Sequence, residues 1–231
     1  MPTDLILRPA QPHDAHDVAS VHLRARRAAP MPPGVHPDDD VRRWLAGRLQ
    51  ADEVWVAEDE GRVVGYARLS EVWLDDLYVE PSHARQGVGS ALLELARTLR
   101  PDGFCLWVFE SNLPARAFYA RHGLVELERT DGTANEERSP DIRVAWPGSE
   151  PLAFLRGLID EVDAQLGDLL ARRAALTRAV QPYKTDPSRR DLEREHQIAT
   201  ALARRAPALG AERIERIVHT IITESLEAAR S

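Results

Sequence analysis

The chain has 231 residues, enough for one large or two modest domains. Its hydrophobic fraction is 43% and its charged fraction 29%, values typical of globular proteins that exclude a disordered or collagen-like chain. Residues 1–147 carry 17 Arg against 24 acidic residues, whereas residues 148–231 carry 12 Arg and one Lys against 13 acidic residues. An acidic first part is a poor partner for nucleic acid or an anionic membrane, so we expect neither.

Two features of the sequence predict the compartment. No apolar run approaches the roughly 20 residues of a membrane helix, and residues Met1–Arg8 lack the basic and apolar regions of a signal peptide. Cys105 is the only cysteine in the sequence, so an internal disulfide is impossible. We therefore expect a cytoplasmic protein.

Strand-like and helix-like segments alternate up to residue 147. Short apolar runs predict strands at Leu5–Arg8, Val54–Ala57, Val63–Ala67, Val72–Val79, Phe104–Phe109, Val125–Glu128 and Ile142–Trp146. The remaining segments predict helices at His13–Arg27, Val41–Leu49, Val88–Leu99 and Pro114–His122. This alternation predicts a mixed α/β domain.

Prolines mark two breaks in this pattern. Ala29–Pro37 contains four prolines and a glycine, so it is predicted to be a loop between the first two helices, and such loops often line substrate sites. Pro147–Pro151 contains two prolines and a glycine within five residues. We therefore expect a domain over residues 1–147, a linker at 148–151 and a second domain over 152–231.

The second part of the chain predicts three helices. Apolar residues at a spacing of three or four predict a first helix over Leu152–Gln181, about 45 Å long. Asp186-Pro187 predicts the start of a second helix that Pro207 ends, and a third contains the stripe Ile214–Leu226. A compact domain of this size is only roughly 30 Å across. The first helix therefore needs a partner along its length, and a two-fold homodimer is the commonest solution.

A possible phosphate-binding turn lies in the first domain. Within Leu77–Leu93, a predicted strand leads through a glycine-containing loop into a helix. Gly87 and Gly89 let the backbone approach a ligand closely, the first N–H groups of the helix point outward, and Arg85 adds a positive charge. A G-x-G before a helix is often only a tight turn. The next strand, however, is followed by the N-x-x-A-x-x-F-Y-x-x-x-G pattern of Asn112–Gly123.

The order strand, G-x-G, helix, strand and N-x-x-A-x-x-F-Y-x-x-x-G resembles the GNAT N-acetyltransferase superfamily over residues 4–147. The resemblance implies a GNAT fold with a mixed central sheet, acetyl-CoA as cosubstrate and no metal. It implies that the pyrophosphate is held by Arg85, Gln86, Gly87, Val88, Gly89 and Ser90. One departure is Ala84, where the family often has Gln or Arg, and this departure suggests weaker binding of CoA.

The same resemblance implies roles in acetyl transfer. Tyr119 would protonate the departing thiolate, and Asn112 would orient the cofactor arm. The main-chain N–H of Val79 would polarise the thioester carbonyl, where fixed dipoles best stabilise developing charge. The alternative for Tyr119 is an aromatic core residue beside Phe118.

A general base and an acceptor are harder to assign. Asp75 and Asp76 point to opposite faces of a strand, and Asp75 shares its face with Leu77 and Val79, which are expected to be buried. Asp76 is therefore the expected base, and a solvated strand end is the alternative. The acceptor stays open between a small amine, an aminoglycoside-like molecule and a protein N-terminus.

Polar residues interrupt the apolar stripes of all three predicted helices in the second domain. Arg173 interrupts the first, and Lys184, the only lysine among 30 basic residues, follows it by about three turns. Glu195 interrupts the second stripe and Ser225 the third. Burying these groups unpaired would cost several kcal/mol each, so they are expected to face one another and a polar ligand.

This pattern resembles the all-helical, AroQ-type chorismate mutases over residues 152–228. The resemblance implies an all-α three-helix domain that forms an intertwined dimer and rearranges chorismate to prephenate without proton transfer. Arg173 would bind a carboxylate, Lys184 the ether oxygen and Glu195 the ring hydroxyl. The further substrate-binding residues that the resemblance implies are Arg156, reaching into the partner's site, and Asp191, Arg194 and Ser225.

Two departures from that family leave the activity open. Ala229 stands where the family usually has Gln or Glu as a second donor to the ether oxygen, and Pro182 directly precedes Tyr183-Lys184. Losing one such donor can cost about 10²–10³ in rate. The sequence thus predicts a bifunctional acetyltransferase and chorismate mutase. The alternatives are a metabolite-binding or dimerisation module, or a related isochorismate-pyruvate lyase or aminodeoxychorismate mutase.

Overall fold

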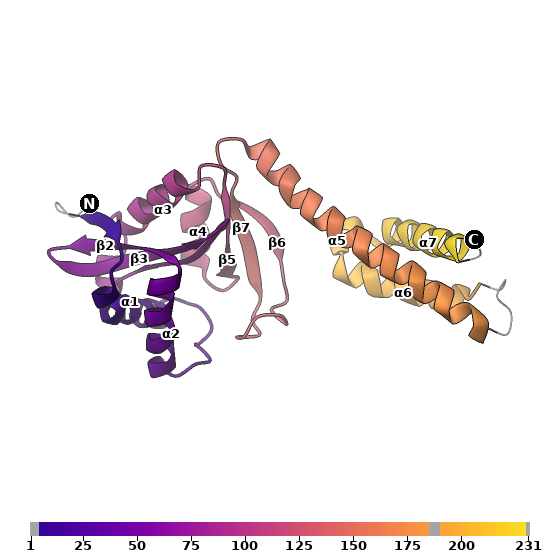
Figure 1. Ribbon diagram of the computed structural model, residues 1–231, viewed down its shortest axis with the longest axis horizontal. Coiled ribbons are helices and arrows are strands. Elements are labelled where there is room, and N and C mark those ends of the chain that lie inside the picture. Colours follow the sequence, from indigo (N-terminus) through magenta and orange to yellow (C-terminus); the bar gives the residue numbers. More distant parts are fainter. Residues whose placement is uncertain (1–4, 185–189, 230–231) are drawn as a thin grey trace. The chain divides into compact units, whose positions relative to one another are not determined.

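The computed structural model describes residues 5–184 and 190–229 (Figure 1). The chain divides into two compact units, Met1–Arg156 and Gly157–Ser231. The division falls within helix α5 (Pro151–Val180), so the domain limits expected from the sequence stay a prediction.

A seven-stranded mixed sheet forms the first unit, as expected, with the strand order β1-β2-β3-β4-β5-β7-β6. Only the β4–β5 pair is parallel among the paired strands described here. The strands are β1 (Ile6–Pro9), β2 (Glu53–Asp59), β3 (Arg62–Ser70), β4 (Trp73–Val79), β5 (Phe104–Phe109), β6 (Val125–Arg129) and β7 (Asp141–Trp146).

Helices cover both faces of this sheet (Figure 1). The helices are α1 (Ala15–Ala28), α2 (Asp38–Ala51), α3 (Val88–Leu99) and α4 (Leu113–Arg121), with 3-10 turns η1 (Pro12–Asp14) and η2 (Pro81–His83). Strand β2 shows the two faces by its alternation. Val54 and Val56 pack with α1 and α2, whereas Trp55 and Ala57 pack with α3 and α4.

A bulge in β4 changes the side on which its residues point. Arg68 of β3 pairs with Asp76, whereas the next residue, Leu69, pairs with Leu74, so Asp75 is the extra residue. Asp76 therefore shares the α1–α2 face with Tyr78, as expected from the alternation. Asp75, expected on the buried face, is exposed because the bulge removes it from the regular pleat.

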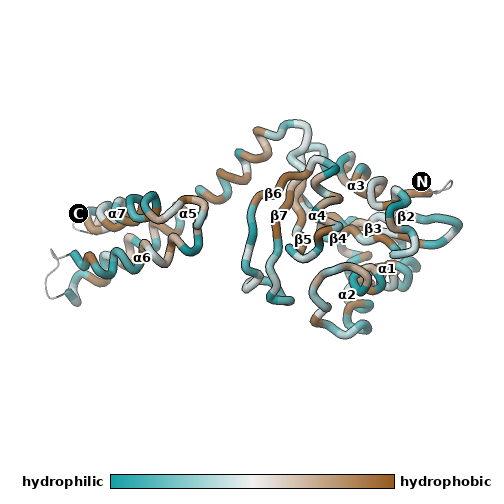
Figure 2. Tube along the Cα trace, turned by 180° about the vertical axis from the view of Figure 1, so that it is seen from behind, coloured by the Kyte–Doolittle hydropathy of each residue, from teal (hydrophilic) through white to brown (hydrophobic). Residues whose placement is uncertain are grey.

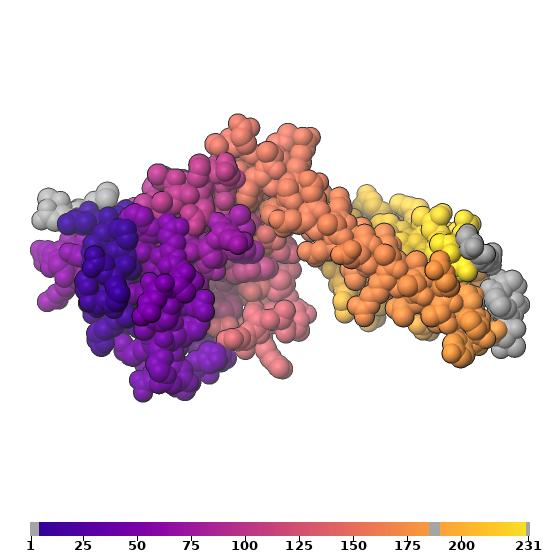
Figure 3. Space-filling view, in the orientation of Figure 1, coloured from indigo at the N-terminus to yellow at the C-terminus, as the bar shows by residue number. Residues whose placement is uncertain are grey.

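The second unit is all-helical, as expected, with α5, η3 (Gln181–Tyr183), α6 (Leu192–Arg205), η4 (Pro207–Leu209) and α7 (Ala211–Ala228). Its buried apolar core comes from α6 and α7, namely Ala199, Ile214, Val218 and Ile222. Helix α5 contributes no buried residue. Its apolar positions recur along its length (Figure 2), and its surface is visible from one end of the helix to the other in Figure 3.

Two details of the helical unit correct the expectation. Asp186-Pro187 lie outside the described residues, and Arg190 and Asp191 are not helical, so α6 begins at Leu192 with Asp191 as its N-cap. Lys184 follows a 3-10 turn with extended backbone, so it does not continue the α5 helix as the three-turn spacing assumed. Within the described part of the chain, no helix is long and apolar enough to cross a membrane.

Candidate active sites

The predicted phosphate-binding turn lies at the start of α3. Gly87 is the N-cap with a left-handed φ of 91°, a conformation that glycine adopts without strain. The first helical hydrogen bond runs from the Ala91 N–H to the Gly87 carbonyl at 2.9 Å. The N–H groups of Val88, Gly89 and Ser90 therefore have no acceptor within the helix, and the positive end of the helix dipole lies with them.

Side chains around this turn differ in their exposure. Arg85 and Gln86 are exposed, and the Gln86 amide donates to the Ser82 carbonyl at 2.8 Å. Val88 is fully buried, so only its backbone N–H can serve a ligand. Ser90 is half-buried, and its hydroxyl lies 3.0 Å from Nε2 of His122. The turn thus offers backbone donors and one exposed cation, which fit a diphosphate.

Strands β4 and β5 separate just below this turn. Among the described residues, the only pair in register between these two strands is Trp73 with Cys105. The Glu80 N–H donates to the Val64 carbonyl of β3 at 2.8 Å. Because hydrogen-bonded pairs alternate along antiparallel strands, the Val79 N–H then points away from β3, towards the gap between β4 and β5.

A small cavity of about 100 Å³ lies between β4, β5 and α4. Tyr119 and Asn112 of the α4 segment line it, as do Asp75 and Tyr78 of β4. Tyr119 is 8% exposed, and burial raises its pKa well above the usual range, so the phenol stays protonated. Asn112 is the N-cap of α4, and its side-chain oxygen accepts a hydrogen bond from the Ala115 N–H at 3.3 Å.

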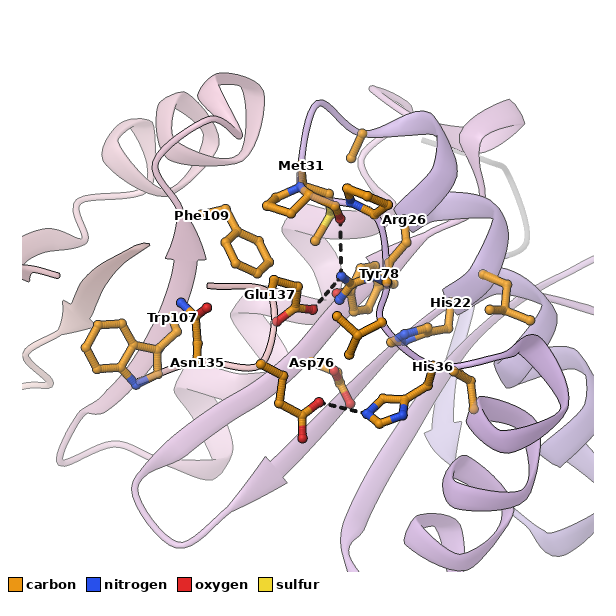
Figure 4. A pocket seen from close by; sticks show the side chains of 18 of the residues that line it. His22, Arg26, Met31, His36, Asp76, Tyr78, Trp107, Phe109, Asn135 and Glu137 are labelled. Atoms are coloured by element: carbon orange, nitrogen blue, oxygen red, sulfur yellow. Dashed lines mark hydrogen bonds and ion pairs between the residues drawn. The ribbon is translucent and has the colours of Figure 1, made fainter. Parts of the chain in front are cut away.

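A larger cavity of about 1380 Å³ opens on the α1–α2 face of the sheet (Figure 4). The proline-containing loop predicted between the first two helices forms part of its wall. Asp75, Tyr78, Met31, Trp107 and Phe109 line both cavities, so the two spaces meet at the gap between β4 and β5. The cavity lined by Tyr119 therefore adjoins the cavity on the α1–α2 face.

The wall of the larger cavity is acidic. Among its lining residues are two arginines, Arg26 and Arg27, and seven carboxylates, namely Asp38, Asp40, Asp75, Asp76, Glu136, Glu137 and Asp141. Two pairs hold the residue 130–140 loop against the α1–α2 segment: Arg26 with Glu137 at 2.8 Å and His36 with Glu136 at 2.9 Å (Figure 4). A cavity with this charge favours a cationic ligand.

Asp76, the expected base, lies in this cavity and is 8% exposed. Nε of Arg68 donates to its carboxylate at 2.6 Å, and the Arg68 guanidinium also contacts Asp52 at 2.9 Å. Arg68 carries no signal of this role in the sequence, because only the β3–β4 register places it opposite Asp76. The Asp76 carboxylate is thus committed to an ion pair.

A buried pair that the sequence did not reveal lies beside Asp76. Nδ1 of His22 is 2.7 Å from the Tyr66 hydroxyl, with exposures of 7% for His22 and 0% for Tyr66. The His22 ring also packs against Tyr78, with 4.5 Å between ring centroids. Burial raises the pKa of Tyr78 to about 12 and lowers that of His22, so both groups are neutral at pH 7.

In the helical unit, the structure brings Arg173 of α5 against α7. Its guanidinium donates to the Ser225 hydroxyl at 2.6 Å and to the Ile221 carbonyl at 3.3 Å. Ser225 is 7% exposed, so two of the predicted polar residues do face each other. Arg156 lies 17 residues earlier in the same helix, about 25 Å away along the axis, and is not part of this contact.

Glu195 has a partner that the sequence analysis did not name. Arg190 donates to both Glu195 oxygens, at 2.8 and 2.7 Å, and to the Thr223 hydroxyl of α7 at 3.1 Å. This fork lowers the pKa of Glu195 and keeps it ionised. Asp191 accepts from the Arg194 N–H at 3.0 Å as the cap of α6, whereas the Arg194 side chain is exposed. Lys184 is half-buried.

Comparison with known families matches both parts of the chain. A family model described as an acetyltransferase (GNAT) domain matches residues 50–126, and a model described as chorismate mutase type II matches residues 155–230. In the described part of the chain, no group of three or more His, Cys, Asp or Glu side chains could hold a metal ion.

Curated relatives match the first part of the chain. The uncharacterized N-acetyltransferase YafP of Escherichia coli is 27% identical over 129 residues, with 53% of this chain and 83% of that protein covered. The amino-acid acetyltransferase of Mycobacterium tuberculosis is 38% identical over 109 residues, with 40% and 60% covered. The chain thus spans less than two thirds of the second relative.

Solved acetyltransferase structures superpose on this chain. YjaB of Escherichia coli in its apo form superposes with a TM-score of 0.54 at 22% identity, covering 64% of this chain and all of that one. The PaiA N-acetyltransferase of Thermoplasma acidophilum, solved with coenzyme A, gives 0.50 at 17% identity, covering 63% and 99%. At this identity the likeness establishes the mixed-sheet fold of the first unit.

Proposed function

We propose that this chain, in which a GNAT acetyltransferase domain is joined to a chorismate mutase type II domain, is a cytoplasmic bifunctional enzyme. Its first activity would be acetylation of a cationic amine by acetyl-CoA, and its second the conversion of chorismate to prephenate. The observation that carries the first is that the acidic cavity and the cavity lined by Tyr119 share five lining residues where β4 and β5 separate.

The start of α3 fits the pyrophosphate of acetyl-CoA, which supplies the activated acetyl group. The backbone N–H groups of Val88, Gly89 and Ser90 and the Arg85 guanidinium would hold it, together with Gln86 and Gly87. Asn112 would orient the pantetheine arm. The Val79 N–H points into the β4–β5 gap, where it would stabilise charge on the carbonyl oxygen.

Tyr119 would give its proton to the departing sulfur. Its raised pKa keeps the phenol protonated at pH 7, so the proton is in place when the carbon–sulfur bond breaks. The acceptor would enter through the larger cavity, whose lining has seven carboxylates and two arginines and therefore favours a cation. Asp76 is the base predicted from the sequence and lies in that cavity.

In the helical domain, the paired groups at the α5–α6–α7 contact suit a dicarboxylate with a hydroxyl. Arg173 and Ser225 would bind a carboxylate, Glu195 would accept from the ring hydroxyl, and Lys184 would stabilise charge on the ether oxygen. Asp191 and Arg194 would support the start of α6. The reaction then needs only a held conformer and fixed charges.

The same proposal includes a homodimer. Eight apolar side chains of α5 are 38–62% exposed, far more than one helix of a globular unit leaves to water: Leu152, Ile159, Val162, Leu166, Leu169, Leu170, Leu176 and Val180. A second copy would cover this stripe. Arg156 would then reach the Arg173 site of the partner. Arg173 of its own chain lies about 25 Å away along the same helix, too far to reach.

One experiment on the full chain tests both activities. With acetyl-CoA, we expect 1,4-diaminobutane to be acetylated at least about 10-fold more efficiently than 4-aminobutanoate, because the second ammonium suits the acidic cavity and a carboxylate does not. With chorismate, we expect prephenate. Thiol release and prephenate absorbance are the measurements. Equal use of both amines would contradict the acceptor class, and no prephenate at high enzyme concentration would contradict the mutase activity.

Tyr119→Phe is expected to leave the Kd for acetyl-CoA unchanged and to lower kcat with 1,4-diaminobutane about 10²-fold, because only the proton for the thiolate is lost. Tyr183→Phe is the matched control, since Tyr183 is 88% exposed and lies in the helical unit. Equal kcat for both variants would remove Tyr119 from the mechanism.

A further inference from the structure

We propose that His22, through Nε2, takes the proton from the acceptor ammonium, and that Tyr66 and Asp76 fix its tautomer. This inference rests on the proposed acetyltransferase function. It assigns Asp76 a positioning role in place of the role of base. The group that accepts the proton is then a buried imidazole on α1 at the wall of the acidic cavity (Figure 4).

The geometry leaves one ring nitrogen of His22 for the acceptor. Nδ1 lies 2.7 Å from the Tyr66 hydroxyl, which is fully buried beneath it. The ring also lies tilted against Tyr78, with 4.5 Å between ring centroids. Because His22 lines the cavity, Nε2 is the nitrogen that an amine in that cavity can meet.

The direction of the hydrogen bonds decides whether Nε2 carries a lone pair. Tyr66 and Asp76 point to the same face from neighbouring strands, and the Asp76 charge and hydrogen bond contribute to the raised pKa of Tyr66. In this proposal Tyr66 donates its proton to Asp76, since a carboxylate only accepts, and the Tyr66 oxygen accepts from Nδ1–H of His22. His22 then carries its proton on Nδ1, and Nε2 is free to act as a base.

Charged groups on three elements face His22. Burial and the cations Arg26 of α1 and Arg68 of β3 lower its pKa, while the Asp76 anion of β4 raises it. Burial dominates, so the imidazole is neutral at pH 7 and can take up a proton. Asp76 itself is held by Arg68 at 2.6 Å, so its carboxylate is engaged in an ion pair, whereas Nε2 of His22 has no partner of that kind in this contact.

His22 and Tyr119 together account for every proton that moves during the acetyl transfer. His22 takes one proton from the ammonium, which leaves a neutral amine with a lone pair. The amine nitrogen forms a bond to the acetyl carbon, and the carbon–sulfur bond breaks. Tyr119 protonates the sulfur, and its phenolate regains a proton from the positively charged nitrogen that the attack creates, which leaves the neutral amide. His22 finally releases its proton to water in the open cavity.

The tautomer can be measured on the full chain by ¹⁵N NMR of the histidines, with His22→Gln to assign the signal. We expect a neutral His22 at pH 7 with its proton on Nδ1, titrating below 6.5, the ordinary value for histidine. Tyr66→Phe and Asp76→Asn are expected to shift the population toward the Nε2–H form. A wild-type proton on Nε2 would overturn the assignment.

Kinetics with acetyl-CoA and 1,4-diaminobutane supply the second readout. We expect His22→Gln to lower kcat/KM about 10²-fold or more without changing the Kd for acetyl-CoA, and to abolish the fall in rate below the His22 pKa. His16→Gln is the matched control, because His16 lies on the same helix and is exposed. An unchanged pH profile in His22→Gln would overturn the inference, whereas no acetylation by the wild-type chain would instead overturn the proposed function.

Discussion

Lys184→Ala is expected to lower kcat for conversion of chorismate by at least about 10²–10³-fold, the effect of removing a fixed charge at a developing oxyanion. The expected effect is large because the position of the family's second donor is Ala229, which has no side-chain donor. Lys184 would then be the main donor to the ether oxygen. Prephenate formation under saturating chorismate is the measurement.

Lys184→Arg is not expected to restore this activity. A lysine ammonium is a compact point charge, whereas a guanidinium is a planar fork of different reach. Arg172→Ala is the control for a lost positive charge, because Arg172 is exposed on α5 beside Arg173. If arginine at position 184 restores most of the rate, any positive charge suffices and the scarcity of lysine in this sequence has no bearing on the mechanism.

Local patterns predicted the elements of the fold well. The alternation of strands and helices, the glycines at the start of α3 and the apolar spacing of α5 each depend on a few neighbouring residues, and each appears in the structure. The α/β character of the first unit and the helical second unit followed from the same patterns, whereas the mixed sheet was implied by the resemblance to the GNAT superfamily. Both units agree with the two matching family models.

The acceptor side of the site could not be predicted in this way, because its contacts join distant segments. His22 meets Tyr66 across 44 residues, and Arg26 meets Glu137 across 111. Only the register of β3 and β4 brings Arg68 to Asp76, and the bulge at Asp75 interrupts the alternation on which face predictions depend. The pairing of Arg190 with Glu195 could not be predicted, because Arg190 lies before helix α6 and outside its apolar stripe.

The strongest test of the dimer uses two inactive variants of the full chain. Arg156→Ala and Lys184→Ala are each expected to abolish most mutase activity, the first by damaging the partner's site and the second its own. In one continuous helix, 17 residues place Arg156 about 25 Å from Arg173, too far for a side chain to span. The exposed apolar stripe of α5 supplies the surface on which a second copy would pack.

When these two variants are unfolded and refolded together, random pairing makes about half of the molecules heterodimers. Each heterodimer has one site with both Arg156 and Lys184 and one site with neither, so about a quarter of the wild-type activity is expected to return. The control mixture is Arg173→Ala with Lys184→Ala, since both changes damage the chain's own site and no pairing repairs it. Light scattering on the eluted peak checks the dimer. A monomer would rule out the shared site, and no recovery in proven heterodimers would mean that Arg156 does not act across the interface.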